Sequence, residues 1–133
     1  MPTPTVRPAT VLVVESDPDS RSLYGAMLRF SGYDALVCDD PGQAAERILR
    51  VDPAAIVFGL GYPAERGIAP LRELRRNPRA AGIPLVVTAT SVRPEVQSAL
   101  DEIGPDAFIL KPVTPTELVA ELGRLIAGGA CVA

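Results

Sequence analysis

Ala54-Ala55-Ile56-Val57-Phe58-Gly59-Leu60-Gly61-Tyr62-Pro63 is the stretch of this 133-residue chain that decides its fold. Its first five residues are apolar without polar alternation, which is typical of a strand buried on both faces of a parallel sheet. Gly59, Gly61 and Pro63 then predict a loop at the carboxyl end of that strand. In open α/β sheets this edge is where ligands bind. Here the residue directly after the predicted strand is Gly59, which has no side chain.

Further apolar runs predict four more strands, at residues 10–14, 34–38, 83–89 and 107–110. Helices are predicted between and after the strands, and several begin with an acid or threonine followed by proline, as helix caps often do. The first has Asp17 as its cap, and the second starts at Asp40 with Ala44, Ala45, Ile48 and Leu49 on its buried face. The last begins with Thr114 to Glu117, a capping box, and is expected to end at Gly128-Gly129.

Strands that alternate with helices predict a three-layer, doubly wound α/β fold with a parallel sheet in the order 2-1-3-4-5. The carboxyl ends of the strands would then form a crevice. We expect it to be lined by Glu15, Ser16, Gly59, Ala89, Thr90 and Lys111. One domain is predicted at residues 10–127, between a flexible lead at 1–9 and a short tail at 128–133.

Composition narrows the classes of function. The net charge of −3 does not favour nucleic acid or an anionic membrane as a partner. No apolar run approaches the roughly 18 residues that cross a bilayer, and the first residues lack a secretory apolar core, so a cytoplasmic protein is expected. The chain has no histidine, and Cys38 and Cys131 are too few for a metal site or a disulfide framework. We interpret Cys38 as a small buried apolar residue.

The segment Val11 to Arg21 with its Glu15-Ser16-Asp17 centre, the loop that ends at Pro63 with Gly67 four residues later, Ile83-Pro84 and Lys111-Pro112 together resemble the receiver domain of bacterial response regulators. The resemblance covers about residues 10–127, and it implies a flavodoxin-like (βα)5 fold. In that family, an acidic pair after the first strand and an aspartate after the third hold Mg²⁺, and the aspartate accepts a phosphoryl group. A threonine or serine after the fourth strand and a lysine after the fifth contact that group.

Carried over by position, the resemblance places the acidic pair at Glu15 and Ser16, the phosphoacceptor at Gly59 and the lysine at Lys111. The threonine position falls on Ala89, five residues after Pro84, with Thr88 and Thr90 on either side. The aromatic residue that rearranges on activation in the family falls on Phe108. The resemblance also implies that the Lys111-Pro112 peptide bond is cis, against a base rate of about 5–6% for X-Pro bonds.

These departures have a chemical consequence, because phosphoryl transfer needs a carboxylate nucleophile and a cation. Gly59 offers no oxygen to phosphorylate. The family pocket has a formal charge of −2, whereas Glu15 and Lys111 together give zero. Mg²⁺ prefers several hard oxygen ligands, so we expect weak or absent Mg²⁺ binding and no other cofactor. The prediction is a pseudo-receiver without enzymatic activity.

Three features have two interpretations each. Lys111 is the only lysine of the chain, and it either pairs with Glu15 across the crevice or stays solvated on the rim. Phe108 is either a remnant of the switch or, as aromatic residues in strands more often are, part of the core. Arg72, Arg75, Arg76 and Arg79 follow helical spacing, and they form either a solvated face or a stripe that docks an acidic partner or a nucleic acid.

The leading hypothesis is a stand-alone response-regulator-like protein of a two-component or phosphorelay pathway, which acts by protein–protein interaction. Its partner would be a histidine kinase or another regulator, and helices 4 and 5 could form a homodimer, while nucleic acid is an unfavoured partner. One alternative is phosphorylation of an unconventional acid, with Asp17, Asp52 or Glu15 as candidates. Another is a module on the same scaffold that senses a small molecule.

Overall fold

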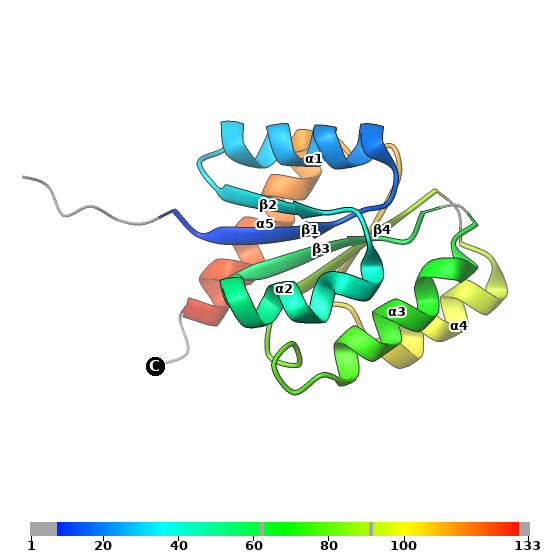
Figure 1. Ribbon diagram of the computed structural model, residues 1–133. Helices are drawn as coiled ribbons and strands as arrows, with labels where there is room; N and C mark the ends of the chain where they lie inside the picture. The colour runs from blue at the N-terminus through cyan, green and yellow to red at the C-terminus, as the bar shows by residue number, and fades with distance from the viewer. Residues whose placement is uncertain (1–7, 62, 91, 131–133) are drawn as a thin grey trace, which may run out of the picture.

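A computed structural model describes residues 8–61, 63–90 and 92–130 of the chain, and within these residues five parallel strands form one sheet (Figure 1). The strand order is β2-β1-β3-β4-β5, which confirms the predicted order 2-1-3-4-5 and the doubly wound α/β fold. The strands are β1 (Thr10–Val14), β2 (Asp34–Cys38), β3 (Ala55–Gly59), β4 (Leu85–Ala89) and β5 (Ala107–Leu110).

Helices cover both faces of this sheet, as right-handed crossovers between parallel strands require (Figure 1). α1 and α5 lie on one face, and α2, α3 and α4 lie on the other. A single 3-10 turn, η1, precedes α2, so the predicted second helix begins with a tighter turn. The helical elements are α1 (Pro18–Phe30), η1 (Pro41–Gln43), α2 (Ala44–Val51), α3 (Glu65–Arg76), α4 (Pro94–Ile103) and α5 (Pro115–Ala130).

The three central strands carry the core. Every residue of β3 and of β4 is buried, and so are four of the five residues of β1. Along β3 the side chains alternate between the two faces, so that Phe58 packs with the α2, α3 and α4 side and Val57 packs with the α1 and α5 side. The continuous apolar runs in the sequence therefore correspond to strands that are buried on both faces of the sheet.

Three predicted element ends differ from the structure. β3 is shifted by one residue, so Gly59 is its last residue and not the first of the loop. β4 begins at Leu85 and not at Ile83, because the chain before it is a turn in which Ile83 N–H bonds to the Ala80 carbonyl. α5 continues through Gly128-Gly129 to Ala130, so the prediction that these glycines end it is wrong. A glycine inside a helix costs about 1 kcal/mol, which does not by itself stop an established helix.

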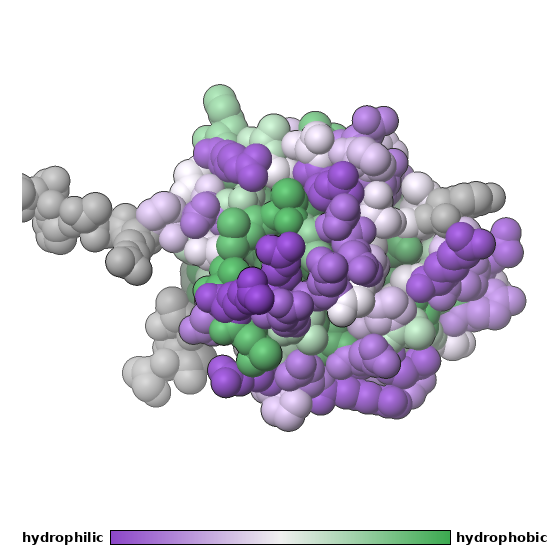
Figure 2. All heavy atoms as spheres, viewed as in Figure 1, coloured by the Kyte–Doolittle hydropathy of each residue, from purple (hydrophilic) through white to green (hydrophobic). Residues whose placement is uncertain are grey.

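Apolar side chains gather over β2 and α2 on the face seen in Figure 2. Leu49 of α2 is 54% exposed, so the prediction that it lies on the buried face is wrong. The neighbouring Ile48 takes the inward position, and a helix turns by about 100° per residue, so Leu49 faces outward. Cys38 is 2% exposed, which confirms its interpretation as a buried apolar residue, and Cys131 lies outside the described residues.

Within the described residues, the helices are all too short or too polar to cross a lipid bilayer.

Candidate functional site

The carboxyl ends of β1, β3 and β5 bring predicted site residues to one edge of the sheet. Glu15 and Ser16 follow β1, Gly59 ends β3, and Lys111 follows β5. The edge holds an open cleft of about 630 Å³. Its lining consists of Ser16, Asp17, Pro18, Ser20, Gly61, Thr90 and Lys111. The predicted crevice therefore exists, with the start of α1 as one of its walls.

Glu15 and Lys111 form an ion pair at the inner end of this cleft. Lys111 Nζ lies 2.8 Å from Glu15 Oε1, the Glu15 side chain is fully buried and the Lys111 side chain is 13% exposed. The interpretation that the only lysine pairs with Glu15 is confirmed, and the rim interpretation is wrong. The Lys111-Pro112 bond is cis, as the resemblance implied.

Both oxygens of the Glu15 carboxylate have partners. Oε1 accepts from Lys111, and Oε2 accepts from the backbone N–H of Asp17 at 3.1 Å. The ammonium group of Lys111 also donates to Ser20 Oγ at 3.3 Å and lies 5.9 Å from the centre of the Tyr24 ring. The only buried acid among the described residues thus has its hydrogen-bonding capacity directed at the protein itself.

Gly59 lies directly against the Glu15 carboxylate. A Cβ atom built on Gly59 would stand 2.6 Å from Glu15 Cδ and still closer to Oε1. These separations are shorter than real Cβ contacts, so any side chain at position 59 would displace Glu15. Glu15 can therefore occupy its position because Gly59 has no side chain.

The structure corrects the prediction for β4. Ala89 is fully buried in the core on the α2, α3 and α4 side, so it does not line the cleft. Thr88 pairs with Gly59 in the sheet register, and its side chain points to the opposite face from that of Ala89. Thr88 is the hydroxyl residue beside Gly59, because neighbouring side chains of a strand alternate between faces. Thr90 lines the outer part of the cleft, as predicted.

Tyr24 is a site residue that the sequence interpretation missed. Its hydroxyl lies 3.2 Å from Thr88 Oγ1, and both residues are at most 1% exposed. Burial raises the pKa of the Tyr24 hydroxyl above its ordinary value. The available signal was helical spacing, since Tyr24 follows Ser20 by four residues and Asp17 by seven on one face of α1.

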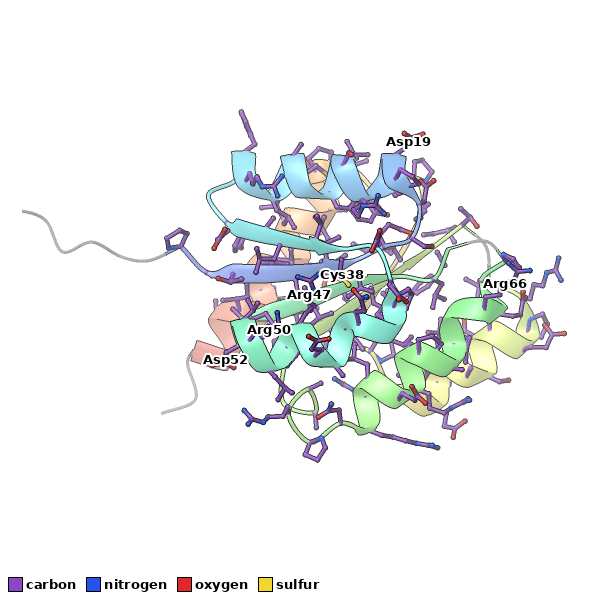
Figure 3. All side chains as sticks on the ribbon, in the orientation of Figure 1. Asp19, Cys38, Arg47, Arg50, Asp52 and Arg66 are labelled. Atoms are coloured by element: carbon purple, nitrogen blue, oxygen red, sulfur yellow. The ribbon has the colours of Figure 1, made fainter. Side chains whose placement is uncertain are left out.

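Asp17 is the cap of α1, as predicted. Its carboxylate accepts the backbone N–H of Ser20 at 3.0 Å. Hydrogen bonds from Ser20, with smaller contributions from Lys111 and Arg21, lower the pKa of Asp17. Asp52 lies at the other end of the sheet from the first turn of α1, where Asp19 is labelled (Figure 3).

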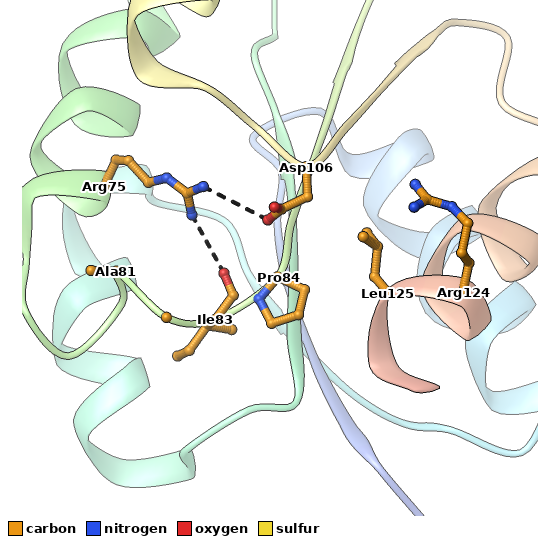
Figure 4. A pocket seen from close by; sticks show the side chains of 8 residues that line it. Arg75, Ala81, Ile83, Pro84, Asp106, Arg124 and Leu125 are labelled. Carbon is orange, nitrogen blue, oxygen red and sulfur yellow. Dashed lines mark hydrogen bonds and ion pairs between the residues drawn. The ribbon is translucent and has the colours of Figure 1, made fainter. Parts of the chain in front are cut away.

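Only three of the four arginines predicted to form a stripe lie on α3. The helix ends at Arg76, so Arg79 lies in the following turn and the prediction of one continuous helical row is wrong. Arg75 donates to the carbonyls of Gly104 at 2.9 Å and Ile83 at 3.5 Å, and it lies 3.7 Å from Asp106. Figure 4 shows the contacts of Arg75 with Ile83 and Asp106, which lie at a second pocket, of about 300 Å³, on the opposite end of the sheet. Arg72 pairs with Glu102 of α4, so two of the four arginines hold α3 in place.

Phe108 belongs to neither core cluster. It lies on β5, at the edge of the sheet, and it is 37% exposed. The interpretation of Phe108 as a core residue is therefore wrong. Only one face of β5 is well covered by other elements, and Ile109 is the residue of β5 that is buried there. Together with Leu110, which is 52% exposed, Phe108 makes the outward surface of β5 apolar.

Metal-ligand groups are sparse in the described ranges, where no three aspartate, glutamate, cysteine or histidine side chains come together. The resemblance assigns Mg²⁺ to an acidic pair and an acceptor aspartate. At the corresponding positions stand Glu15, whose oxygens already have partners, Ser16 and Gly59. This donor set does not fit Mg²⁺, which proteins hold through one or two carboxylates, because both oxygens of its one carboxylate already accept hydrogen bonds from the protein.

Known proteins that are similar to this chain include several proteins of two-component signalling. Residues 11–123 match the family described as the response regulator receiver domain. The DNA-binding response regulator MtrA of Mycolicibacterium smegmatis is 34% identical over 113 residues, which are 84% of this chain and 48% of that protein. The phosphate regulon transcriptional regulatory protein PhoB of Pseudomonas aeruginosa is 29% identical over 88% of this chain and 51% of its own length.

This chain thus spans about half the length of these two curated relatives. Among solved structures, a receiver domain of a sensor histidine kinase from Pseudomonas aeruginosa, with a magnesium ion coordinated in its active site cleft, superimposes with a TM-score of 0.80. It is 25% identical, and the match covers 90% of this chain and 98% of that chain.

Proposed function

Because the chain belongs to the response regulator receiver domain family of two-component signalling, we propose that it signals through protein contacts and without a phosphoryl group. In this proposal it is a pseudo-receiver, in which the phosphoacceptor position is held by Gly59. Its partner is a histidine kinase or another regulator, the classes of protein that receiver domains contact.

One observation supports this function above the others, namely the contact between Gly59 and the carboxylate of Glu15. Receivers take up phosphate on a carboxylate oxygen, which attacks phosphorus as a nucleophile. The only buried acid within the described part of this cleft is Glu15, and its two oxygens accept from Lys111 and from the Asp17 N–H. A fully buried carboxylate whose two oxygens both accept hydrogen bonds is a poor nucleophile for a phosphodonor in solvent.

The ion pair between Glu15 and Lys111 bears on Mg²⁺ binding. We propose that Mg²⁺ binds weakly or not at all, because the ammonium group of Lys111 occupies the side of Glu15 where a cation would compete. Titration calorimetry with MgCl₂ at millimolar concentration is expected to give no saturable heat. A saturable site that disappears in Glu15→Gln would contradict this part of the proposal.

Incubation with acetyl phosphate and MgCl₂, followed by intact mass measurement, tests the function itself. We expect the mass of the parent protein to stay unchanged. An added phosphoryl group would overturn the pseudo-receiver proposal and restore the alternative of an unconventional acceptor. Separate Glu15→Gln, Asp17→Asn and Asp52→Asn variants would then identify the acid. Asp17 lines the cleft but caps α1, Glu15 is fully buried against Lys111, and Asp52 lies at the far end of the sheet.

The volume of the cleft, about 630 Å³, favours one further candidate function, the binding of a small molecule. The lining combines Pro18 and Gly61 with three hydroxyl side chains, Asp17 and Lys111. Two opposite charges among small residues suit a compact charged ligand more than a large apolar one. Thermal-shift screening with nucleotides and flavins tests this alternative. A concentration-dependent rise in melting temperature that Ser16→Trp abolishes would favour it over protein contacts alone.

For the protein partner, we propose the face formed by α4, β5 and α5, where Phe108 and Leu110 are exposed on β5. This face would bind either a second copy of the chain or the partner regulator. A pull-down from the native cell, repeated with Leu110→Asp, tests the assignment. The loss of captured regulators or kinases in the variant is the expected result, and capture that is insensitive to Leu110→Asp would refute it.

A further inference from the structure

We infer that Glu15 supplies, from the neighbouring strand, the carboxylate that position 59 lacks, so that residues 15 and 59 form a matched pair facing Lys111. The inference deepens the proposed function and rests on its assignment of Gly59 to the acceptor position. It adds that the glycine is not a simple deletion of a functional group. One carboxylate still faces Lys111, and it comes from the chain that follows β1 and not from β3.

The backbone geometry allows this exchange because β1 and β3 are adjacent. Val14 pairs with Phe58, so Glu15 and Gly59 each stand one position further along the chain. The Glu15 side chain therefore points to the face of the sheet that a side chain at position 59 would also take. The Glu15 carboxylate reaches sideways into the volume beside the Gly59 Cα, where a Cβ would meet Oε1 and Cδ. A glutamate at 15 with any larger residue at 59 would require one of them to move.

The electrostatics of the site favour one carboxylate and not two. Lys111 is the cation that faces Glu15, and the Glu15 carboxylate is fully buried. A second buried carboxylate at position 59 would lack a counter-charge, and an unpaired buried charge is strongly unfavourable. If the carboxylate were removed from Glu15, Lys111 would lose its partner in the same way. The buried position that faces Lys111 therefore requires one acid, which either residue 15 or residue 59 can carry.

A simpler explanation is that Glu15 is buried only because it bonds to the Asp17 N–H at the start of α1. In that case, moving the carboxylate to position 59 would not restore stability, because an acid on β3 could not accept the hydrogen bond from the Asp17 N–H. The two explanations differ in one measurable quantity, the interaction between substitutions at 15 and 59.

The experiment is a double-substitution cycle that moves the carboxylate without changing the net charge. The parent, Glu15→Ala, Gly59→Asp and the double variant are compared by urea unfolding followed by far-UV circular dichroism. We expect each single substitution to lower the urea midpoint strongly, and the double variant to unfold at a higher midpoint than either single variant. The control is Glu15→Ala with Gly59→Asn, which has nearly the same shape without the charge and is expected to recover less.

A double variant whose loss equals the sum of the two single losses would overturn the inference, and so would a double variant that does not fold. Equal recovery by aspartate and asparagine would also overturn it, because the retained charge would then have no role. The cycle is independent of phosphoryl uptake by the parent. Phosphorylation of the parent would refute the proposed function and leave the cycle unaffected, whereas additivity would refute the matched pair and leave the proposed function in place.

Discussion

Lys111 Nζ lies 2.8 Å from Glu15 Oε1, although 96 positions separate the two residues in the chain. The lysine follows β5 and the glutamate follows β1, and β3 and β4 lie between those strands in the sheet. The pair therefore connects the edge of the sheet to its centre across the cleft. Interactions of this kind are weak evidence for overall stability, but they are costly to break from one side.

Replacement of Lys111 by methionine is expected to destabilise the protein by about 3 kcal/mol, because it leaves the buried Glu15 carboxylate without its cation. Urea unfolding measures the loss. Arg50→Met is the matched control, since Arg50 pairs with Glu46 at 2.7 Å on the surface of α2 and both side chains are more than half exposed. The loss of that pair should cost less than about 1 kcal/mol. Equal losses in the two variants would mean that burial of the Lys111 pair has no energetic consequence.

Replacement of Tyr24 by phenylalanine is expected to cost about 1–2 kcal/mol, because the buried Thr88 hydroxyl loses its partner. Thr88→Val alone should cost a similar amount for the same reason. In the double variant both polar groups are gone, so its loss in urea unfolding should be smaller than the sum of the single losses. Strict additivity would show that the Tyr24 and Thr88 hydroxyls do not depend on each other.

Tyr24 also predicts sensitivity to alkaline pH. Burial raises its pKa in the folded protein above the ordinary value of 10.0, whereas the unfolded chain titrates at that value. The contribution of the neutral hydroxyl to stability is therefore complete below pH 10 and is lost as the pH rises towards the folded pKa. Unfolding curves measured from pH 8 upwards should show a decline above about pH 10. Tyr24→Phe should remove part of this decline, and Tyr33→Phe should leave it largely unchanged.

The fold was predictable from the sequence because each central strand is covered on both faces. Such strands appear as uninterrupted apolar runs, and Ala55 to Phe58 is the clearest of them. The order of the strands follows from the handedness of their connections. Predictions of burial were less accurate for elements that other parts of the protein cover only in part. Phe108 and Leu49 are both apolar, but each lies on an element or helix face that solvent reaches, which an apolar side chain alone does not indicate.

The candidate site was predictable in part. Glu15, Gly59 and Lys111 were found because each stands at the end of a strand, and parallel strands end at one edge. Ala89 was chosen by counting along the chain from Pro84, but the face of a strand residue depends on its register with the neighbouring strand. Gly59 pairs with Thr88, and this register is set only when β3 and β4 come together in the folded sheet. Tyr24 was missed because a large residue in a helix usually belongs to the core, and its hydroxyl reaches Thr88 only after α1 has packed on the sheet.

The Asp17 cap predicts a dependence of stability on acidic pH. Hydrogen bonds from Ser20 lower the pKa of the Asp17 carboxyl below the model-compound value of 3.8 in the folded protein. The contribution of the ionised Asp17 carboxylate to stability is therefore complete above the pKa that Asp17 has in the unfolded chain. It is lost as the pH falls through the lower pKa that Asp17 has in the folded protein. Asp17→Asn keeps a capping oxygen but does not titrate. The slope of stability against pH below about pH 4 should be smaller in this variant. Asp19→Asn, in the exposed first turn of α1, is the control and should change that slope less.

Arg75 and Arg76 provide the last prediction, because they are consecutive residues in the last turn of α3 and differ only in what they contact. Both benefit equally from the negative end of the helix dipole. Arg75 donates to the carbonyls of Gly104 and Ile83, which connects α3 to the turns before β5 and β4, whereas Arg76 is exposed.

Arg75→Ala is therefore expected to cost about 1–2 kcal/mol in urea unfolding, and Arg76→Ala is expected to stay within about 0.5 kcal/mol of the parent. If the arginines instead form a docking stripe, both variants would weaken the binding of an acidic partner equally and neither would change stability. Equal stabilities of the two variants would contradict the structural role of Arg75. A stability loss confined to Arg75→Ala would leave Arg76 and Arg79 as the exposed members of the predicted stripe that a partner could contact.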